Sequence, residues 1–167
     1  LAPFILGVLA AAAPLHAESP SNWPQFRGPG ASGIAANARP PLKIGPTEAH
    51  RWKVSVPWSP SSPVVWDDTV YLTTFDDGEL QVRAYSAGDG SIRWKCGFRP
   101  AAIEEHHRAD GSPAASSPAT DGHHVVSYFG SFGLVCHAAD GRELWRRQLP
   151  VAESGGKFGT GTSPVIS

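Results

Sequence analysis

Short runs of β-branched and aromatic residues, separated by polar turns, fill the chain from residue 50 onward. Thr69–Phe75 and His123–Phe129 are typical of such runs, whose residue types favour extended strands. Asp-Gly pairs separate the runs. Glycine adopts the positive φ of a tight hairpin and aspartate bonds its own backbone. The pattern predicts eight short antiparallel strands: Ser62–Trp66, Thr69–Phe75, Leu80–Tyr85, Ile92–Phe98, Ser117–Ala119, His123–Phe129, Gly133–His137 and Arg142–Leu149.

These runs repeat with a period of about 50 residues. A Ser-Pro opening at Ser62–Val65 recurs at Ser117–Ala119 and at Ser163–Ile166. An Asp-Gly turn followed by tryptophan, at Gly88–Trp94, recurs at Ala139–Trp145. Four antiparallel strands in a period of about 45–50 residues are one blade of a β-propeller. The sequence therefore predicts an all-β propeller with four-stranded antiparallel blades.

The repeat divides residues 50–167 into two complete blades, 62–98 and 116–149, and two partial ones. Residues 51–56 resemble the last strand of a blade and predict an outer closing strand. Residues 162–167 predict the first strand of a further blade. About two and a half blades cannot close a ring, which needs at least four. We expect a fragment of a larger propeller. One hypothesis is that the fragment has no independent function, since its exposed blade edges favour aggregation.

The N-terminal region resembles an export signal. Leu1–Ala13 is an apolar run, and Ala17 ends a small-residue cleavage site, so residues 1–17 are predicted to be a signal peptide truncated at its start. The run is shorter than the roughly 20 apolar residues that cross a membrane. We therefore expect an exported protein, periplasmic or extracellular, without an integral membrane segment in the mature chain.

Residues 18–49 are rich in proline and glycine and predict an extended leader. Trp23 and Phe26 stand in an otherwise polar stretch, and large aromatic side chains favour burial. We expect both rings to pin the leader to the propeller surface.

Composition narrows the function classes. The 167 residues carry a net charge of -1, which provides no electrostatic basis for binding nucleic acid. Hydrophobic residues make up 41%, enough for a packed core. Cys96 and Cys136 are the only cysteines, and either a disulfide or two buried thiols fits the sequence.

Two eleven-residue stretches, Ala84–Trp94 and Val135–Trp145, resemble the tryptophan-docking repeat of quinoprotein dehydrogenases, which bind pyrroloquinoline quinone (PQQ). Trp23–Pro29 resembles the opening segment of a subset of these proteins. The resemblance implies a ring of seven or eight blades in which each tryptophan packs between neighbouring blades. The blade-docking residues that it implies are Trp52, Trp94, Trp145, Gly90, Gly141, Asp89 and Asp140.

The same resemblance implies, for the enzymes of the family, PQQ, a calcium ion, a catalytic aspartate and a disulfide between adjacent cysteines. Cys96 and Cys136 are not adjacent, and we assign no catalytic residue and no metal ligand in this chain. His106-His107 lacks the helical spacing of a zinc pair. The side chains of His123-His124, opening a strand, point to opposite faces. Cofactor-binding residues stay unassigned.

The sequence thus favours an exported binding or scaffold module that takes a protein or a small-molecule ligand on a propeller face. The alternative is a PQQ-dependent dehydrogenase, oxidising an alcohol or a sugar, whose site lies in other blades. The sequence leaves open the ligand, quinone binding, the total number of blades and the oligomeric state.

Overall fold

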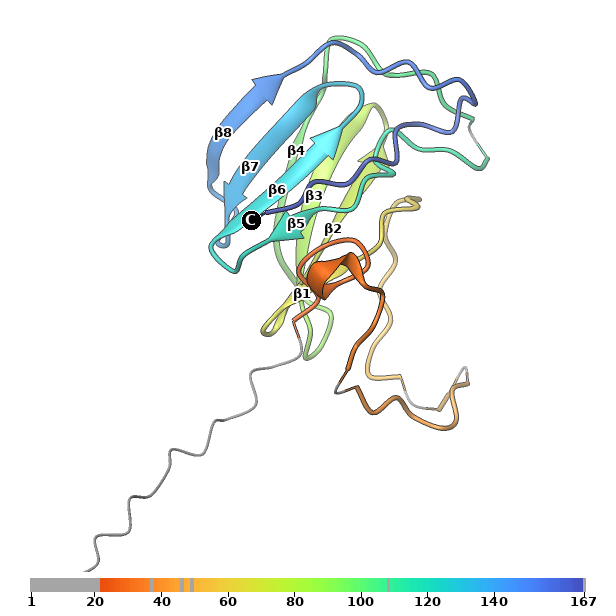
Figure 1. Cartoon of the computed structure of the whole chain (residues 1–167), viewed down its shortest axis with the longest axis vertical. Coiled ribbons are helices and arrows are strands. Elements are labelled where there is room, and N and C mark those ends of the chain that lie inside the picture. Colours follow the sequence, from red (N-terminus) through yellow and green to blue (C-terminus); the bar gives the residue numbers. More distant parts are fainter. Residues whose placement is uncertain (1–21, 37, 46, 49, 108, 167) are drawn as a thin grey trace, which may run out of the picture.

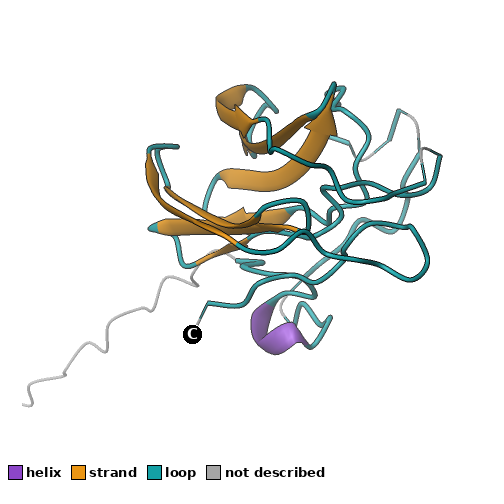
Figure 2. Ribbon diagram, turned by 90° about the horizontal axis from the view of Figure 1, so that it is seen from above, coloured by secondary structure: helices purple, strands orange, loops and turns teal. Residues whose placement is uncertain are grey.

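The computed structural model describes residues 22–36, 38–45, 47–48, 50–107 and 109–166. The predicted signal peptide, 1–17, lies outside the described residues. Two four-stranded antiparallel sheets, here named blade 1 and blade 2, lie one against the other (Figures 1 and 2). No helix in the described ranges is long and apolar enough to cross a membrane.

Each blade follows the chain order, with every strand paired to the next. The predicted strands recur within about two residues of their expected bounds, because strand residues alternate with hairpin turns as the sequence pattern indicated. The all-β class with four-stranded antiparallel sheets is confirmed. Blade 1 contains β1 (Val64–Trp66), β2 (Thr69–Asp76), β3 (Glu79–Ser86) and β4 (Ile92–Phe98), and blade 2 contains β5 (Ala119–Thr120), β6 (His124–Phe129), β7 (Gly133–Ala138) and β8 (Glu143–Gln148).

Two predicted strands do not form, and several other strand ends differ from their predicted bounds by one or two residues. Residues 51–56 and 162–166 are not strands, because within the described ranges neither segment forms the backbone hydrogen bonds to a neighbouring strand that define one. Residue 167 lies outside the described residues. The predicted strand at His123 begins one residue later, since the backbone N–H groups of His123 and His124 both donate to the carboxylate of Asp121.

The hydrophobic core lies between and within the two sheets. Inner strands bury alternate residues or nearly all of them, whereas every residue of the outermost strand β8 is exposed. Removing each large core side chain from water is worth about 1.5–3 kcal/mol. The largest fully buried core residues include Phe129, Leu80, Val64, Val82, Val125 and Val135.

The leader contacts the first strand of each blade. Trp23 and Val65 exchange two backbone hydrogen bonds of 2.8 Å, and the carbonyl of Pro24 accepts one of 2.8 Å from the N–H of Thr120. The Trp23 ring packs against Gly28, where an added Cβ would lie 2.5 Å from it. The side chain of Phe26 is 48% exposed, so the prediction that both rings pin the leader is wrong for Phe26.

The two ends of the blades carry different segments. The β1–β2 end holds the turns that connect β1 to β2 and β3 to β4, together with the leader contact at Trp23. The β2–β3 end holds the turn between those two strands and the long connection 99–118 from β4 to β5 (Figure 1). This second end contains the candidate site.

Candidate functional site: an aromatic recess at the blade ends

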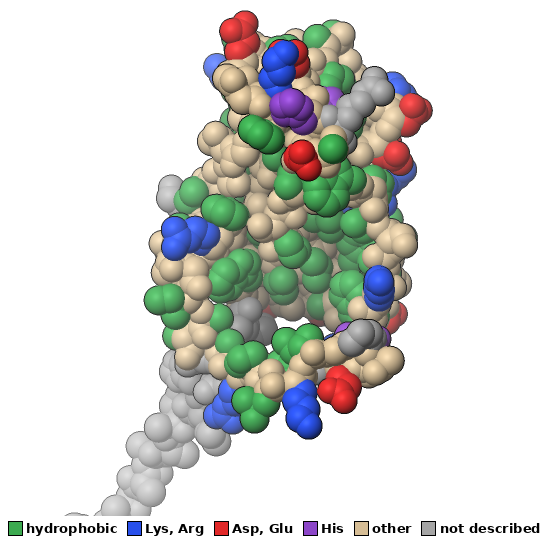
Figure 3. All heavy atoms as spheres, turned by 90° about the vertical axis from the view of Figure 1, so that its right-hand side faces the viewer, with side chains coloured by type: hydrophobic (Ala, Val, Ile, Leu, Met, Phe, Trp, Pro, Cys, Tyr) green, Lys and Arg blue, Asp and Glu red, His purple; other side chains and the backbone are tan. Residues whose placement is uncertain are grey.

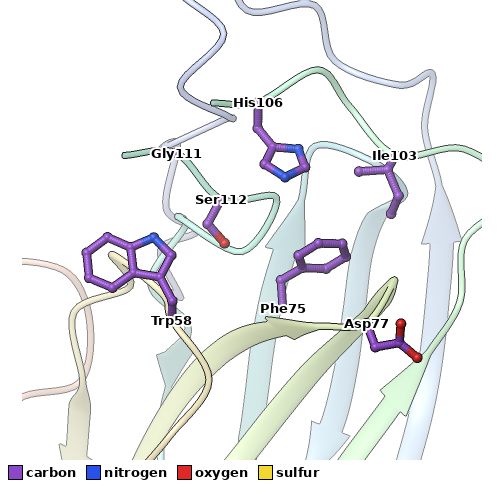
Figure 4. A pocket seen from close by; sticks show the side chains of 7 residues that line it. All are labelled: Trp58, Phe75, Asp77, Ile103, His106, Gly111 and Ser112. Atoms are coloured by element: carbon purple, nitrogen blue, oxygen red, sulfur yellow. The ribbon is translucent and has the colours of Figure 1, made fainter. Parts of the chain in front are cut away.

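A recess of about 600 Å³ opens at the β2–β3 end. It lies between the end of β2, the segment that precedes β1, and the connection from β4 to β5 (Figure 4). Its walls are mainly apolar, and the face of the molecule seen in Figure 3 gathers hydrophobic side chains below a group of charged residues. The recess is lined by Trp58, Phe75, Asp77, Ile103, His106, Gly111 and Ser112.

Two rings meet at the centre of the recess. Phe75 is half-buried one residue before the end of β2, and its ring lies edge-to-face with the imidazole of His106, with centroids 5.7 Å apart and planes at 81°. Edge-to-face contacts of this kind are favourable for aromatic pairs. The Nδ1 of His106 lies 3.1 Å from the carbonyl oxygen of Glu104, which orients the imidazole toward Phe75 (Figure 4).

Trp58 forms the outer wall and is 61% exposed. The backbone beside it is held in place, because the hydroxyl of Ser59 donates to the carbonyl of Ala114 at 2.7 Å and accepts from the N–H of Ser61 at 3.1 Å. A large ring on a fixed backbone, with most of its surface in water, is available to a ligand.

The floor of the recess depends on close contact between the connection 99–118 and the segment that follows β8. The N–H of Ser112 donates to the carbonyl of Phe158 at 3.3 Å, and a Cβ added at Gly111 would lie 2.7 Å from that same oxygen. Only glycine therefore fits at position 111. The connection 99–118 and the segment that follows β8 thus form one continuous platform under the recess.

Asp77 is the only carboxylate among the seven lining residues. Its Oδ2 lies 3.0 Å from the Nη2 of Arg99, yet its side chain is 94% exposed. Asp77 has a φ of 44°, a left-handed conformation that aspartate tolerates in turns.

Glu104 lies beneath the platform and is 2% exposed. Its Oε2 accepts a hydrogen bond of 2.6 Å from the hydroxyl of Thr160, and its backbone N–H donates to the hydroxyl of Ser131 at 3.0 Å. Burial raises the pKa of the Glu104 carboxyl, and the hydrogen bond from Thr160 opposes this only in part. Glu104 therefore connects the platform to blade 2.

The tryptophans of the repeat lie away from the recess, at the β1–β2 end. The Nε1 of Trp52 donates to the carbonyl of Ala87 at 2.9 Å, and the Nε1 of Trp94 donates to that of Ala139, also at 2.9 Å. Each ring lies directly over the glycine of an Asp-Gly turn. An added Cβ would approach Trp52 to 2.6 Å at Gly90 and Trp94 to 2.7 Å at Gly141. Trp145, at the matching place on β8, is 46% exposed.

The aspartates of these turns bond their own backbone. Asp89 Oδ1 accepts from the N–H of Ser91 at 3.0 Å and from its hydroxyl at 2.7 Å, and these bonds lower the pKa of Asp89 to about 2. Asp140 Oδ1 accepts from the N–H of Arg142 at 2.9 Å. Both side chains stabilise the turn on which a tryptophan lies.

The histidines and cysteines form no common site. His106 contacts Phe75, whereas the ring of His107 lies 5.3 Å from that of Phe158. The described residues include no group of three or more histidine, cysteine, aspartate or glutamate side chains that could hold a metal ion. Cys96 and Cys136 are free thiols. The sulfur of Cys96 donates to the carbonyl of Gly141 at 3.1 Å, across the blade interface.

Sequence reasoning did not find the recess, because its residues come from three segments that share no motif. One signal was available: Trp58 lies outside the repeat, so blade docking does not account for it.

No protein-family model matches the chain, and no curated protein matches it. Among solved structures, the chain is similar to the crystal structure of BamB from Moraxella catarrhalis, with a TM-score of 0.51 and 18% sequence identity. The match covers 72% of this chain and 36% of BamB, so the chain spans about a third of that protein's length. The likeness shows the fold: the two blades are part of a β-propeller.

Proposed function

We propose that this chain is part of an exported, quinoprotein-like β-propeller that works as a binding or scaffold module. The observation that carries the proposal is the aromatic recess, a fixed concave surface with apolar walls and one carboxylate. Binding sites are typically concave and apolar, with a few well-placed polar groups. The similarity to BamB supports the propeller fold on which this proposal rests. Export rests on the apolar run and cleavage site at the N-terminus.

In this proposal the repeat tryptophans join consecutive blades. Trp94 of blade 1 contacts the turn of blade 2, and Trp52 makes the same contact with the turn of blade 1. The exposed ring of Trp145 is the matching contact for a further blade. Residues 51–56 form no strand in the structure, but they carry Trp52 over blade 1 and so take the place of an outer strand for a preceding blade.

The recess does not fit PQQ with its calcium ion. Calcium takes six to eight oxygen ligands. The recess offers one carboxylate, Asp77, which is already paired with Arg99. A quinone site would therefore have to lie outside the recess.

The test is a titration of the full chain with PQQ and calcium, followed by dye reduction with alcohols and sugars as substrates. A binding module gives no substrate-dependent dye reduction. Tight quinone binding together with substrate-dependent reduction would contradict the proposal and establish the dehydrogenase alternative. The Asp77→Asn variant serves as a control, because any activity that needs the carboxylate of the recess is lost in it.

A further inference from the structure

We infer that the aromatic recess binds an arginine side chain presented by an extended segment of a partner protein. This inference rests on the proposed binding function and specifies its ligand. It follows from three features of the recess: its rings, its charge and its rigidity.

The rings suit a flat cation on an apolar stem. Trp58 and Phe75 line the same recess, and tryptophan is the aromatic side chain that attracts a cation most strongly. A guanidinium group stacks on such rings more readily than an ammonium group, because it is planar and weakly hydrated. The side chain of Ile103 provides apolar surface for the aliphatic stem.

The charge around the recess selects a cation. Among the described residues of segments 75–79, 99–107 and 109–112, together with the adjoining Lys157, acidic side chains outside the core outnumber the basic ones. The acidic residues are Asp76, Asp77, Glu79, Glu105 and Asp110, and the basic ones are Arg99 and Lys157, which pair with Asp77 and Glu105. Asp77 lies at the edge of the recess with its side chain 94% exposed. Its Oδ2 already accepts from Arg99, so Oδ1 is the carboxylate oxygen that can accept a hydrogen bond from an incoming guanidinium.

The recess is rigid before any ligand arrives. Ser59 fixes the backbone beside Trp58, the contact with Phe75 orients His106, and Gly111 lies against the backbone of Phe158. A preorganised site loses less conformational entropy on binding. An extended partner segment with one arginine can therefore bind without rearranging the recess.

The experiment titrates the isotope-labelled full chain with the peptide acetyl-Ala-Ala-Arg-Ala-Ala-amide and follows the tryptophan indole N–H signals by NMR. The matched probe replaces arginine with citrulline, which keeps the shape and removes the charge. We expect the arginine peptide to shift the Trp58 signal and leave that of Trp145 unmoved. The citrulline peptide should bind about tenfold more weakly. Added salt should weaken binding of the arginine peptide more than binding of the citrulline peptide.

Variants test the two contacts separately. The Trp58→Ala variant should bind the arginine peptide about tenfold more weakly than the unmodified chain does. The Asp77→Asn variant should bind it about threefold to tenfold more weakly. Asp67→Asn is the matched control: Asp67 also occupies a hairpin turn of blade 1 with positive φ, but at the opposite end, and its replacement should leave affinity unchanged.

Equal binding of the two peptides, undiminished binding to Trp58→Ala, or no binding at millimolar peptide would each overturn the inference. None of these results involves a quinone. A failed arginine site is therefore distinguishable from a failed binding function, which the PQQ titration tests.

Discussion

The indole Nε1 of Trp94, on blade 1, donates a hydrogen bond of 2.9 Å to the carbonyl oxygen of Ala139, on blade 2. Trp52 makes the same bond, of the same length, to Ala87. In both cases the acceptor immediately follows a strand, and the ring covers the glycine of the Asp-Gly turn that follows. The same local arrangement thus occurs twice in this chain, and at Trp94 it joins the two β-sheets.

Replacing Trp94 should weaken the interface between the blades. Trp94→Phe removes the N–H donor and should lower the free energy of unfolding by about 1 kcal/mol, because the partly buried carbonyl of Ala139 loses its partner. Trp94→Ala should cost about 3 kcal/mol through lost packing. Urea denaturation followed by circular dichroism measures both. Trp145→Ala is the control, and its effect should stay below about 1 kcal/mol because the ring is 46% exposed.

A methyl group at Gly141 should disrupt the same contact from the other side. Gly141 has a φ of 92°, and an added Cβ would lie 2.7 Å from the Trp94 ring, so Gly141→Ala introduces both backbone strain and a clash. We expect a loss of about 2–3 kcal/mol. Gly155→Ala is the matched substitution, because nothing lies within 4 Å of its added Cβ. Equal denaturation midpoints for the two variants would contradict this assignment.

The leader should depend on Trp23 and not on Phe26. Trp23→Ala removes the ring that packs against Gly28 and should make the leader more sensitive to protease. Phe26→Ala should leave the cleavage rate near that of the unmodified chain, since the ring is 48% exposed. Limited proteolysis with mass spectrometry compares the two rates. Rapid leader cleavage in the unmodified chain would show that the backbone bonds to Val65 and Thr120 are transient.

His137 should make stability depend on pH. The side chain is 3% exposed, and its ring lies 5.7 Å from that of Trp94. Burial lowers the pKa of His137 below its ordinary value of 6.5, with Glu143 opposing the shift and Arg146 adding to it. His137 therefore binds a proton more readily in the unfolded chain than in the folded chain. Stability should fall as pH drops below 6.5, by at most about 1.4 kcal/mol per pH unit.

His137→Phe keeps a ring against Trp94 and removes the titration, so the fall in denaturation midpoint below pH 6.5 should become shallower. His123→Asn alters an exposed histidine nearby and should keep the original pH dependence. If the denaturation midpoint fell equally steeply with pH in both variants, the pH dependence of stability would come from groups other than His137.

The two cysteines should remain thiols after oxidative folding. Cys96 contacts Gly141 across the blade interface, and Cys136 is buried within blade 2. Burial raises the pKa of both thiols, which keeps them protonated and slow to react at neutral pH. Alkylation after denaturation without reductant should label two cysteines per chain, and labelling of the folded chain should be much slower. A mass lower by two hydrogens would instead reveal a disulfide.

The strands, turns and blade repeat were predictable because each depends on local chemistry. β-branched and aromatic runs favour strands, and Asp-Gly pairs between such runs favour the tight turns that connect them. The same local rules explain why Asp89 and Asp140 bond the residues that follow them.

The recess and the leader contact depended on tertiary structure. Trp58, Phe75 and His106 come from segments that become neighbours only when the connection 99–118 folds back over the end of blade 1. Residues 51–56 have strand-like sequence, yet a strand requires a neighbour with which to share hydrogen bonds. Phe26 and Trp23 look equivalent in sequence, but only Trp23 finds a strand edge and a glycine to pack against. Local sequence thus decided which elements form. Packing between distant elements decided which side chains are left to meet a ligand.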